Sequence, residues 1–337
     1  MAAIATFHCV FEHMKRYLGL GIVFLIGLGL GFAGQWLIKE QVNQEVRLRQ
    51  TQYDLINPLL ECESAAFENA EGLGGLESEL DKLIQDSIAQ GKTTQVSVYY
   101  RDLNNGPWIG IGEKAEFAPA SLVKVPLMMA LFKQTETDAS ILDKPVTIPA
   151  SVEYADINII PEATLSAGQT YPVSKLIEQM ITQSDNNAYD LLVGVVEPSV
   201  LERVYQDLYL GKTLSLSEQG EENIITVKDY AGFFRVLYNS SYVSQRYSQQ
   251  ALELLTKTQF KGGLVAQLPD GVKVAHKFGE RNFTFSGLKQ LHDCGVVYAK
   301  TSPYLLCVMT KGDDFEQLEG VIQAVSKMVY QAHTKTD

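Results

Sequence analysis

Two clusters of strand-like sequence, separated by a long helical stretch, restrict the folds open to this chain more than any other feature. Alternating apolar residues mark a strand at Gln95 to Leu103, the Asn-Asn-Gly string after it is typical of a hairpin, and Trp108 to Ile111 returns as a second strand. Strand patterns return at 272–278, 288–298 and 304–310. Between the clusters, from residue 120 to about residue 261, the apolar periodicity is helical.

Helical patterns also flank the strands. One covers Leu76 to Ile88 and ends at Gly91, and an amphipathic pattern runs from about Phe315 to Ala332. Within the insert, helices are expected at 121–133, 173–183, 189–195, 227–239 and 248–257. This order predicts an α+β domain, in which an antiparallel five-stranded sheet is flanked by the N- and C-terminal helices, with an all-helical subdomain beside it.

The N-terminal part contains a long uncharged segment. No charged residue occurs from Tyr17 to Ile38, and a helix of that length reaches across the roughly 30 Å apolar core of a bilayer. We therefore expect residues 17–38 to be an uncleaved transmembrane signal-anchor after a cytoplasmic tail at 1–16. A cleaved signal peptide is the alternative, because Gly31 and Ala33 form a small-residue cleavage site.

The next segment has mixed charge. Residues 39–70 are rich in Gln and Glu, with an apolar patch at 55–60, which is typical of a stalk with one docking segment. The domain then occupies 71–337. The net charge of −12 argues against a nucleic-acid partner, because phosphate binding requires a surplus of Lys and Arg.

Cysteine usage indicates neither a disulfide scaffold nor a metal centre. The four cysteines form no C-x-x-C pair and no His/Cys ligand spacing, so no metal or other cofactor is expected. Cys294 and Cys307 fall on two neighbouring predicted strands. Two buried thiols are the favoured interpretation, and a cross-strand disulfide is the alternative if the domain is extracytoplasmic.

Three short strings carry the chemistry. In chain order they are Ser121-Leu122-Val123-Lys124 at the start of an apolar helix, Ser184-Asp185-Asn186 just past a helix, and Lys277-Phe278-Gly279 on a strand. The chain thereby resembles the class A β-lactamase and penicillin-binding-protein superfamily of serine hydrolases, whose signature is S-x-x-K, S-D-N and K-T-G. The resemblance covers roughly residues 73–334. S-x-x-K alone is weak evidence, because the string at 286–289 matches it too.

A serine and a lysine at this spacing are suited to nucleophilic catalysis. Serine needs a base beside it to act as a nucleophile, and Lys124 lies one helical turn from Ser121. Burial of this apolar helix, together with a second ammonium from Lys277, is expected to lower the pKa of Lys124 and free its lone pair. The position of Ser121 at a helix N-terminus also directs its N–H toward an oxyanion hole.

The resemblance implies roles for the remaining residues. Ser184 would relay a proton between Lys124 and the leaving nitrogen, and Lys277 would favour the hydroxyl of Ser184 and a substrate carboxylate. The predicted catalytic set is therefore Ser121, Lys124, Ser184 and Lys277. The predicted substrate-binding set is Asn186 for an amide side chain, Gly279, Glu280 as the second oxyanion donor, and Arg281.

The chain departs from the family pattern at three places. Phe278 replaces the hydroxyl residue that helps bind a carboxylate, and Arg281 is the expected substitute. Pro126 removes a donor within the helix of the nucleophile. The E-x-x-L-N string that supplies the deacylating glutamate is missing between 210 and 227, where Glu222 is the best replacement and Glu218 and Glu221 compete with it.

Three functions remain open at this stage. The first is a membrane-anchored serine hydrolase that opens β-lactam amides through an acyl-enzyme on Ser121. The second is a D-alanyl-D-alanine carboxypeptidase or related hydrolase of cell-wall peptides, and the third is a non-catalytic binding module. The first two predict a single-pass protein of the bacterial cytoplasmic membrane with an extracytoplasmic domain. The oligomeric state is not indicated.

Overall fold

The computed structural model describes residues 53–58, 73–104, 106–149, 165–208 and 224–335. The chain divides into two compact units, Met1–Asp54 and Leu55–Asp337, and the second is described below. The predicted tail and signal-anchor lie outside the described residues. Among the helices that the structure describes, none has both the length and the apolar character needed to cross a bilayer.

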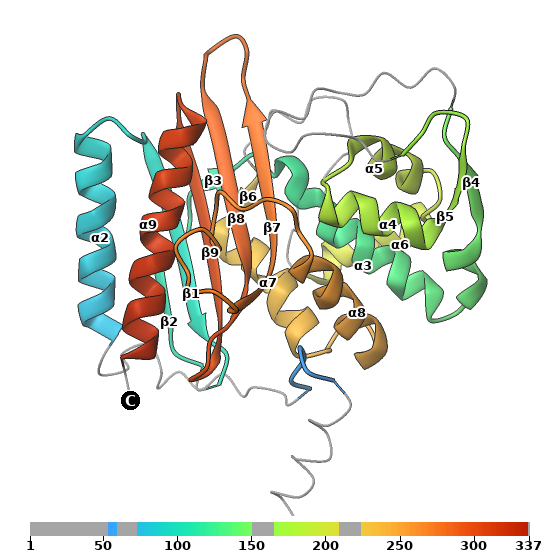
Figure 1. Ribbon diagram of the computed structural model, residues 1–337, viewed down its shortest axis with the longest axis horizontal. Coiled ribbons are helices and arrows are strands. Elements are labelled where there is room, and N and C mark those ends of the chain that lie inside the picture. Colours follow the sequence, from blue (N-terminus) through green and yellow to red (C-terminus); the bar gives the residue numbers. More distant parts are fainter. Residues whose placement is uncertain (1–52, 59–72, 105, 150–164, 209–223, 336–337) are drawn as a thin grey trace, which may run out of the picture. The chain divides into compact units, whose positions relative to one another are not determined.

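A five-stranded antiparallel sheet forms the centre of the domain, as the strand patterns predicted (Figure 1). Its spatial order is β2-β1-β9-β8-β7. The strands are β1 (Gln95–Asp102), β2 (Trp108–Ile111), β7 (Lys273–Asn282), β8 (Lys289–Tyr298) and β9 (Pro303–Gly312). Because β7 pairs only with β8, it is an edge of the sheet, and it continues past the predicted end at Phe278.

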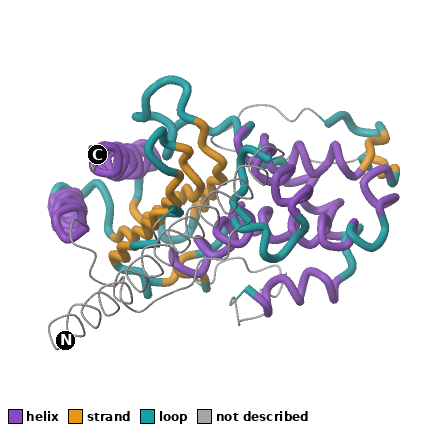
Figure 2. Tube along the Cα trace, turned by 90° about the horizontal axis from the view of Figure 1, so that it is seen from below, coloured by secondary structure: helices purple, strands orange, loops and turns teal. Residues whose placement is uncertain are grey.

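Helices cover both faces of this sheet. Helices α2 (Leu73–Ala89) and α9 (Phe315–Thr334) pack together on one face, and α7 (Val227–Tyr238) contacts β1, β8 and β9. Figure 2 shows the sheet between the two terminal helices and the helical part of the domain. Residues along β1 and β9 are accordingly buried on both sides rather than alternately. The core between the sheet and the terminal helices includes Leu80, Ile84, Val308, Ile322 and Val325.

The predicted all-helical insert contains more than the expected helices. It comprises α3 (Lys124–Thr135), α4 (Val173–Thr182), α5 (Asn186–Val193), α6 (Pro198–Asp207), α7 and α8 (Gln245–Thr256). Helix α6 was not predicted, because its buried stripe is only Leu201, Val204 and Tyr205. Two small antiparallel pairs were also missed, namely β3 (Glu116–Phe117) with β6 (Ile225–Thr226) and β4 (Pro145–Thr147) with β5 (Thr170–Pro172).

Cys294 and Cys307 form a disulfide, so the favoured prediction of two free thiols is wrong. They lie directly opposite each other on β8 and β9, and Lys277 on β7 is the next partner of Cys294 in the same row. The sequence could not distinguish the two states, because a buried thiol and a buried half-cystine produce the same apolar strand pattern.

The segment that precedes helix α2 is buried against the rest of the domain and hydrogen-bonded to it. Leu55 and Ile56 are buried. The N–H of Leu55 donates to Oε1 of Gln249 at 3.0 Å, and its carbonyl accepts from the hydroxyl of Tyr298 at 2.8 Å. This is the position at which the apolar patch predicted a docking segment.

Candidate active site

Ser121 lies in a short 3-10 turn, Ala120–Val123, that leads into α3. The sequence predicted a continuous helix from Ser121, whereas α3 begins at Lys124. Ala120 has a φ of 47°, an unfavourable backbone conformation for a residue other than glycine. The hydroxyl of Tyr230 on α7 donates to the carbonyl of Leu122 at 3.0 Å and so holds this turn in place.

Pro126 does not interrupt the helix. It is the third residue of α3, within the first turn, where backbone N–H groups have no partner inside the helix. The donor that Pro126 removes is therefore one that would have had no partner inside the helix.

Lys124 joins the first two strings. Its Nζ donates to Oγ of Ser121 at 2.9 Å, to the carbonyl of Ser184 at 2.6 Å and to Oδ1 of Asn186 at 2.6 Å. The side chain is 1% exposed. Burial lowers the pKa of Lys124 to about 7, against the opposing attraction of Asp185 and other nearby carboxylates. Close to neutral pH, a large fraction of this amine is therefore unprotonated and able to accept a proton.

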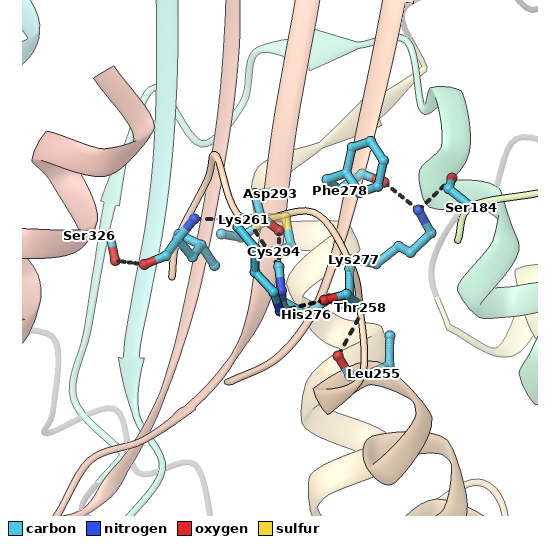
Figure 3. A network of polar contacts seen from close by, with 12 residues as sticks. Ser184, Leu255, Thr258, Lys261, His276, Lys277, Phe278, Asp293, Cys294 and Ser326 are labelled. Carbon is cyan, nitrogen blue, oxygen red and sulfur yellow. Dashed lines mark hydrogen bonds and ion pairs between the residues drawn. A yellow bond between two sulfur atoms is a disulfide. The ribbon is translucent and has the colours of Figure 1, made fainter. Parts of the chain in front are cut away.

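Lys277 joins the second and third strings (Figure 3). Its Nζ donates to Oγ of Ser184 at 2.9 Å and to the carbonyl of Phe278 at 2.7 Å. Burial, followed by the charge of Lys124, lowers the pKa of Lys277 well below its ordinary value. The sequence prediction had the second ammonium acting on Lys124. Burial is the largest cause of the lowered pKa in both lysines, and the two ammonium groups, both close to Oγ of Ser184, repel each other.

Ser184 stands between the two lysines. Its Oγ lies 3.2 Å from Nζ of Lys124 and 2.9 Å from Nζ of Lys277. The residue has a φ of 57°, and the next residue, Asp185, caps α5 by accepting from the N–H of Ala188. The tight turn between α4 and α5 thus presents Ser184 and Asn186 together to the nucleophile.

The edge position of β7 determines which of its backbone groups point toward Ser121. The carbonyl of His276 accepts from the hydroxyl of Thr258, and that of Phe278 accepts from Lys277, so both point away from β8. Backbone groups alternate sides along an antiparallel strand, so the N–H of Glu280 points the same way. This is the direction that an oxyanion donor requires.

Gly279 allows this edge to approach the nucleophile closely. A Cβ added there would lie 3.0 Å from Cγ of Leu122 and 3.1 Å from the carbonyl of Pro119. Contacts this short are tighter than side chains normally make, so only glycine fits without displacing the turn that carries Ser121.

The side chains of Phe278 and Arg281 lie outside the hydrogen-bonded group formed by Ser121, Lys124, Ser184 and Lys277. The Phe278 ring is buried, stacks on Phe260 at 4.4 Å between ring centres, and lies 4.2 Å from Nζ of Lys277. The guanidinium of Arg281 is half-buried and lies 5.7 Å from the ring centre of Phe283. The acidic residues considered as deacylating bases, including Glu222, lie outside the described residues.

Comparison with known proteins decides the family. The sequence model of the Beta-lactamase enzyme family matches residues 76–333, which is most of the chain. The chain belongs to this family. It is a serine hydrolase of the class A β-lactamase type. The family's fold and the three strings thus agree with the resemblance inferred from the sequence.

Individual family members are distant relatives of this hydrolase. It is 24% identical over 294 residues to the extended-spectrum beta-lactamase PER-1 of Pseudomonas aeruginosa, covering 82% of this chain and 93% of that protein. Among solved structures, PBP-A, as a mutant in an acyl-enzyme complex with penicillin G, has a TM-score of 0.66 at 23% identity, covering 78% and 97% of the two chains. A beta-lactamase from Chitinophaga pinensis has a TM-score of 0.64 at 20% identity, covering 76% and 99%.

Sequence reasoning missed several residues around the site of this β-lactamase-family chain. Tyr230 and Thr258 left no local signal, because a single hydroxyl within a helical pattern is ordinary. His276 and Asp293 did leave one, since each interrupts an apolar strand. They form a buried pair, with Nδ1 of His276 2.9 Å from Oδ1 of Asp293. A buried carboxylate needs such partners.

Proposed function

We propose that this chain is a membrane-anchored serine acyl hydrolase that opens β-lactam amides through an acyl-enzyme on Ser121. The observation that carries the proposal is the buried Nζ of Lys124, 2.9 Å from Oγ of Ser121. With the pKa of Lys124 lowered to about 7, this group is a general base for the serine at neutral pH.

The acylation step follows from these contacts. As Oγ of Ser121 attacks the carbonyl carbon, its proton passes to the neutral amine of Lys124. The N–H groups of Ser121 and Glu280 bind the resulting oxyanion. When the C–N bond breaks, the proton moves from Lys124 through the hydroxyl of Ser184 to the leaving nitrogen. Lys277 orients that hydroxyl, and an ester on Ser121 remains for water to hydrolyse.

Substrate binding is assigned to residues around this centre. Asn186 uses its carbonyl oxygen to accept from Lys124, which leaves its NH₂ for the amide side chain of an acyl donor. Gly279 and Glu280 offer backbone groups along the edge of β7. Arg281, farther along the same strand, is proposed as a contact for the distal part of the substrate.

A second function shares the same acylation chemistry. A D-alanyl-D-alanine carboxypeptidase, or a related hydrolase of cell-wall peptides, is favoured by the missing E-x-x-L-N string. Without a glutamate to activate water, the acyl-enzyme would be long-lived. The intact set of Ser121, Lys124, Ser184 and Lys277 argues against a purely non-catalytic binding module.

The proposed location is the outer face of a bacterial cytoplasmic membrane. The uncharged segment 17–38 supports anchoring, and the disulfide between Cys294 and Cys307 supports an oxidising compartment. Protease treatment of intact and lysed cells tests this location. Digestion of the domain in intact spheroplasts agrees with the proposal, and protection until lysis contradicts it.

Mass spectrometry after exposure to penicillin tests the function. The expected result is a covalent adduct on Ser121 that is absent in Ser121→Ala. Rapid loss of the adduct indicates a β-lactamase, whereas persistence over hours, with turnover of D-alanyl-D-alanine peptides, indicates the carboxypeptidase. A chain that forms no adduct and leaves peptides intact would contradict both functions.

A further inference from the structure

One loop contacts two of the three catalytic segments at once. It follows α8 and begins with Thr258 and Gln259. The hydroxyl of Thr258 donates to the carbonyl of His276 at 2.7 Å (Figure 3). The N–H of Gln259 donates to the carbonyl of Thr182 at 2.9 Å. His276 directly precedes Lys277, and Thr182 lies two residues before Ser184. Two adjacent residues therefore bridge the Ser-Asp-Asn turn and the Lys-Phe-Gly strand.

One short hydrogen bond between the Ser-Asp-Asn turn and the Lys-Phe-Gly strand matters for the chemistry, and it lies beside the two bridging contacts. Nζ of Lys277 lies 2.9 Å from Oγ of Ser184, and the two residues come from the sheet and the helical part of the domain. A hydrogen bond across two parts of a fold keeps its length only if something fixes the parts against each other. Thr258 and Gln259 hold the chain close to each end of this contact, beside Lys277 and near Ser184.

Thr258 is well suited to this task. Its side chain is fully buried, with 0% exposure. The hydroxyl of a threonine just past a helix can donate to a carbonyl of that helix, and here the carbonyl of Leu255 lies 3.0 Å from the hydroxyl of Thr258. The hydroxyl has a single hydrogen, and the shorter of its two acceptor distances is the one to the carbonyl of His276 on β7. We propose that Thr258 is a positioning residue whose hydroxyl fixes the start of β7 so that Lys277 reaches Ser184.

The other end of the loop is held separately. The N–H of Leu264 donates to Oδ2 of Asp293 at 2.9 Å, and its carbonyl accepts from the hydroxyl of Ser326 on α9 at 2.6 Å. Ser326 is also fully buried. Its hydroxyl holds the same loop without touching either catalytic segment, so Ser326→Ala is a matched control for the loss of a buried hydroxyl.

The inference rests on the proposed function, because the contact between Lys277 and Ser184 matters only if Ser184 relays the proton. Thr258→Val keeps the shape of the side chain and removes the donor. Lys124 and Ser121 lie in one continuous segment, so activation of the nucleophile is retained. We therefore expect initial binding of the acyl donor to be unchanged and the acylation rate constant to fall about tenfold or more, as small misplacements of catalytic groups do.

The experiment compares wild type, Thr258→Val, Thr258→Ser and Ser326→Ala as full-length chains. Stopped-flow measurement with a chromogenic cephalosporin separates the binding constant from the acylation rate constant. The expected result is a slower acylation step in Thr258→Val alone, with recovery in Thr258→Ser. Wild-type acylation in Thr258→Val, or an equal loss in Ser326→Ala, would overturn the inference. If the valine variant does not fold, Thr258→Cys, whose thiol is a weak donor, replaces it.

A crystal structure of Thr258→Val keeps this test separate from that of the proposed function. A lengthened distance between Nζ of Lys277 and Oγ of Ser184 supports the positioning role, even if no tested β-lactam acylates the wild type. Retention of the 2.9 Å contact overturns the positioning role, whatever the rates. Absence of acylation in wild type counts against the proposed function alone.

Discussion

Replacing Lys124 by methionine tests the physical state of the base directly. The ordinary pKa of lysine, 10.5, falls to about 7 in the folded chain. Between these two values the unfolded chain holds a proton that the folded chain has lost. The free energy of unfolding of the wild type therefore rises with pH across this window, by up to about 1.4 kcal/mol per pH unit. Below about pH 7, the folded chain bears the full cost of burying the charge.

The magnitude follows from the same two values. Their difference, 10.5 minus about 7, corresponds to about 5 kcal/mol at low pH. Methionine has a similar length and does not titrate. The stability of Lys124→Met relative to wild type should therefore decrease by about 2 kcal/mol between about pH 7 and about pH 9. Because the charge of Lys124 also lowers the pKa of Lys277, both proteins are compared in a Lys277→Met background, which removes this coupled titration.

Urea denaturation of both proteins at a series of pH values measures this difference. The absolute offset between the two proteins depends on how methionine packs, but the pH dependence does not. A difference that stays flat across this window, or that changes in the opposite direction, would refute a buried lysine with a lowered pKa. Acylation of Ser121 should be lost in the variant and should rise through about pH 7 in the wild type.

Three further substitutions follow from packing and hydrogen bonding. Gly279→Ala should slow acylation strongly while the chain stays folded, because its Cβ would lie 3.0 Å from Leu122; circular dichroism and penicillin labelling check this. Asp293→Ala leaves the ring of His276 and the N–H of Leu264 without their buried acceptor and should lower the free energy of unfolding by about 1 to 3 kcal/mol for each group, measured by urea denaturation. Tyr230→Phe removes the donor to Leu122 and should cost about 1 kcal/mol, with slower acylation; unchanged stability and rate would contradict its anchoring role.

The architecture could be predicted, and the three strings could be recognised, because both depend on local patterns. Strand alternation located the sheet, and chain order alone indicated that terminal helices cover it. Short spacings identify the motif residues Ser121, Lys124 and Ser184. Their assembly into one site depends on a fold that brings distant segments within hydrogen-bond distance. The expectation that they assemble came from the family resemblance.

The remaining features depend on long-range contacts that leave no periodic trace. The polar end of β7, from Glu280 to Asn282, lacks the apolar alternation by which a strand is recognised. The bridge at Thr258 joins residues that are distant in sequence through a single hydroxyl. The lowered pKa values of Lys124 and Lys277 depend on how deeply the fold buries each amine and on how close it brings the two, and neither can be calculated from composition.

The edge position of β7 has a consequence for solubility. An exposed edge strand is a template on which further strands add, and proteins that leave one open tend to aggregate. Here two outward carbonyls, those of His276 and Phe278, are occupied by the chain's own Thr258 and Lys277. The turn that carries Ser121 and helix α8 also pack against β7, and residues 274–279 are buried. The same side chains that orient the catalytic groups thus shorten the surface on which copies of the chain could polymerise.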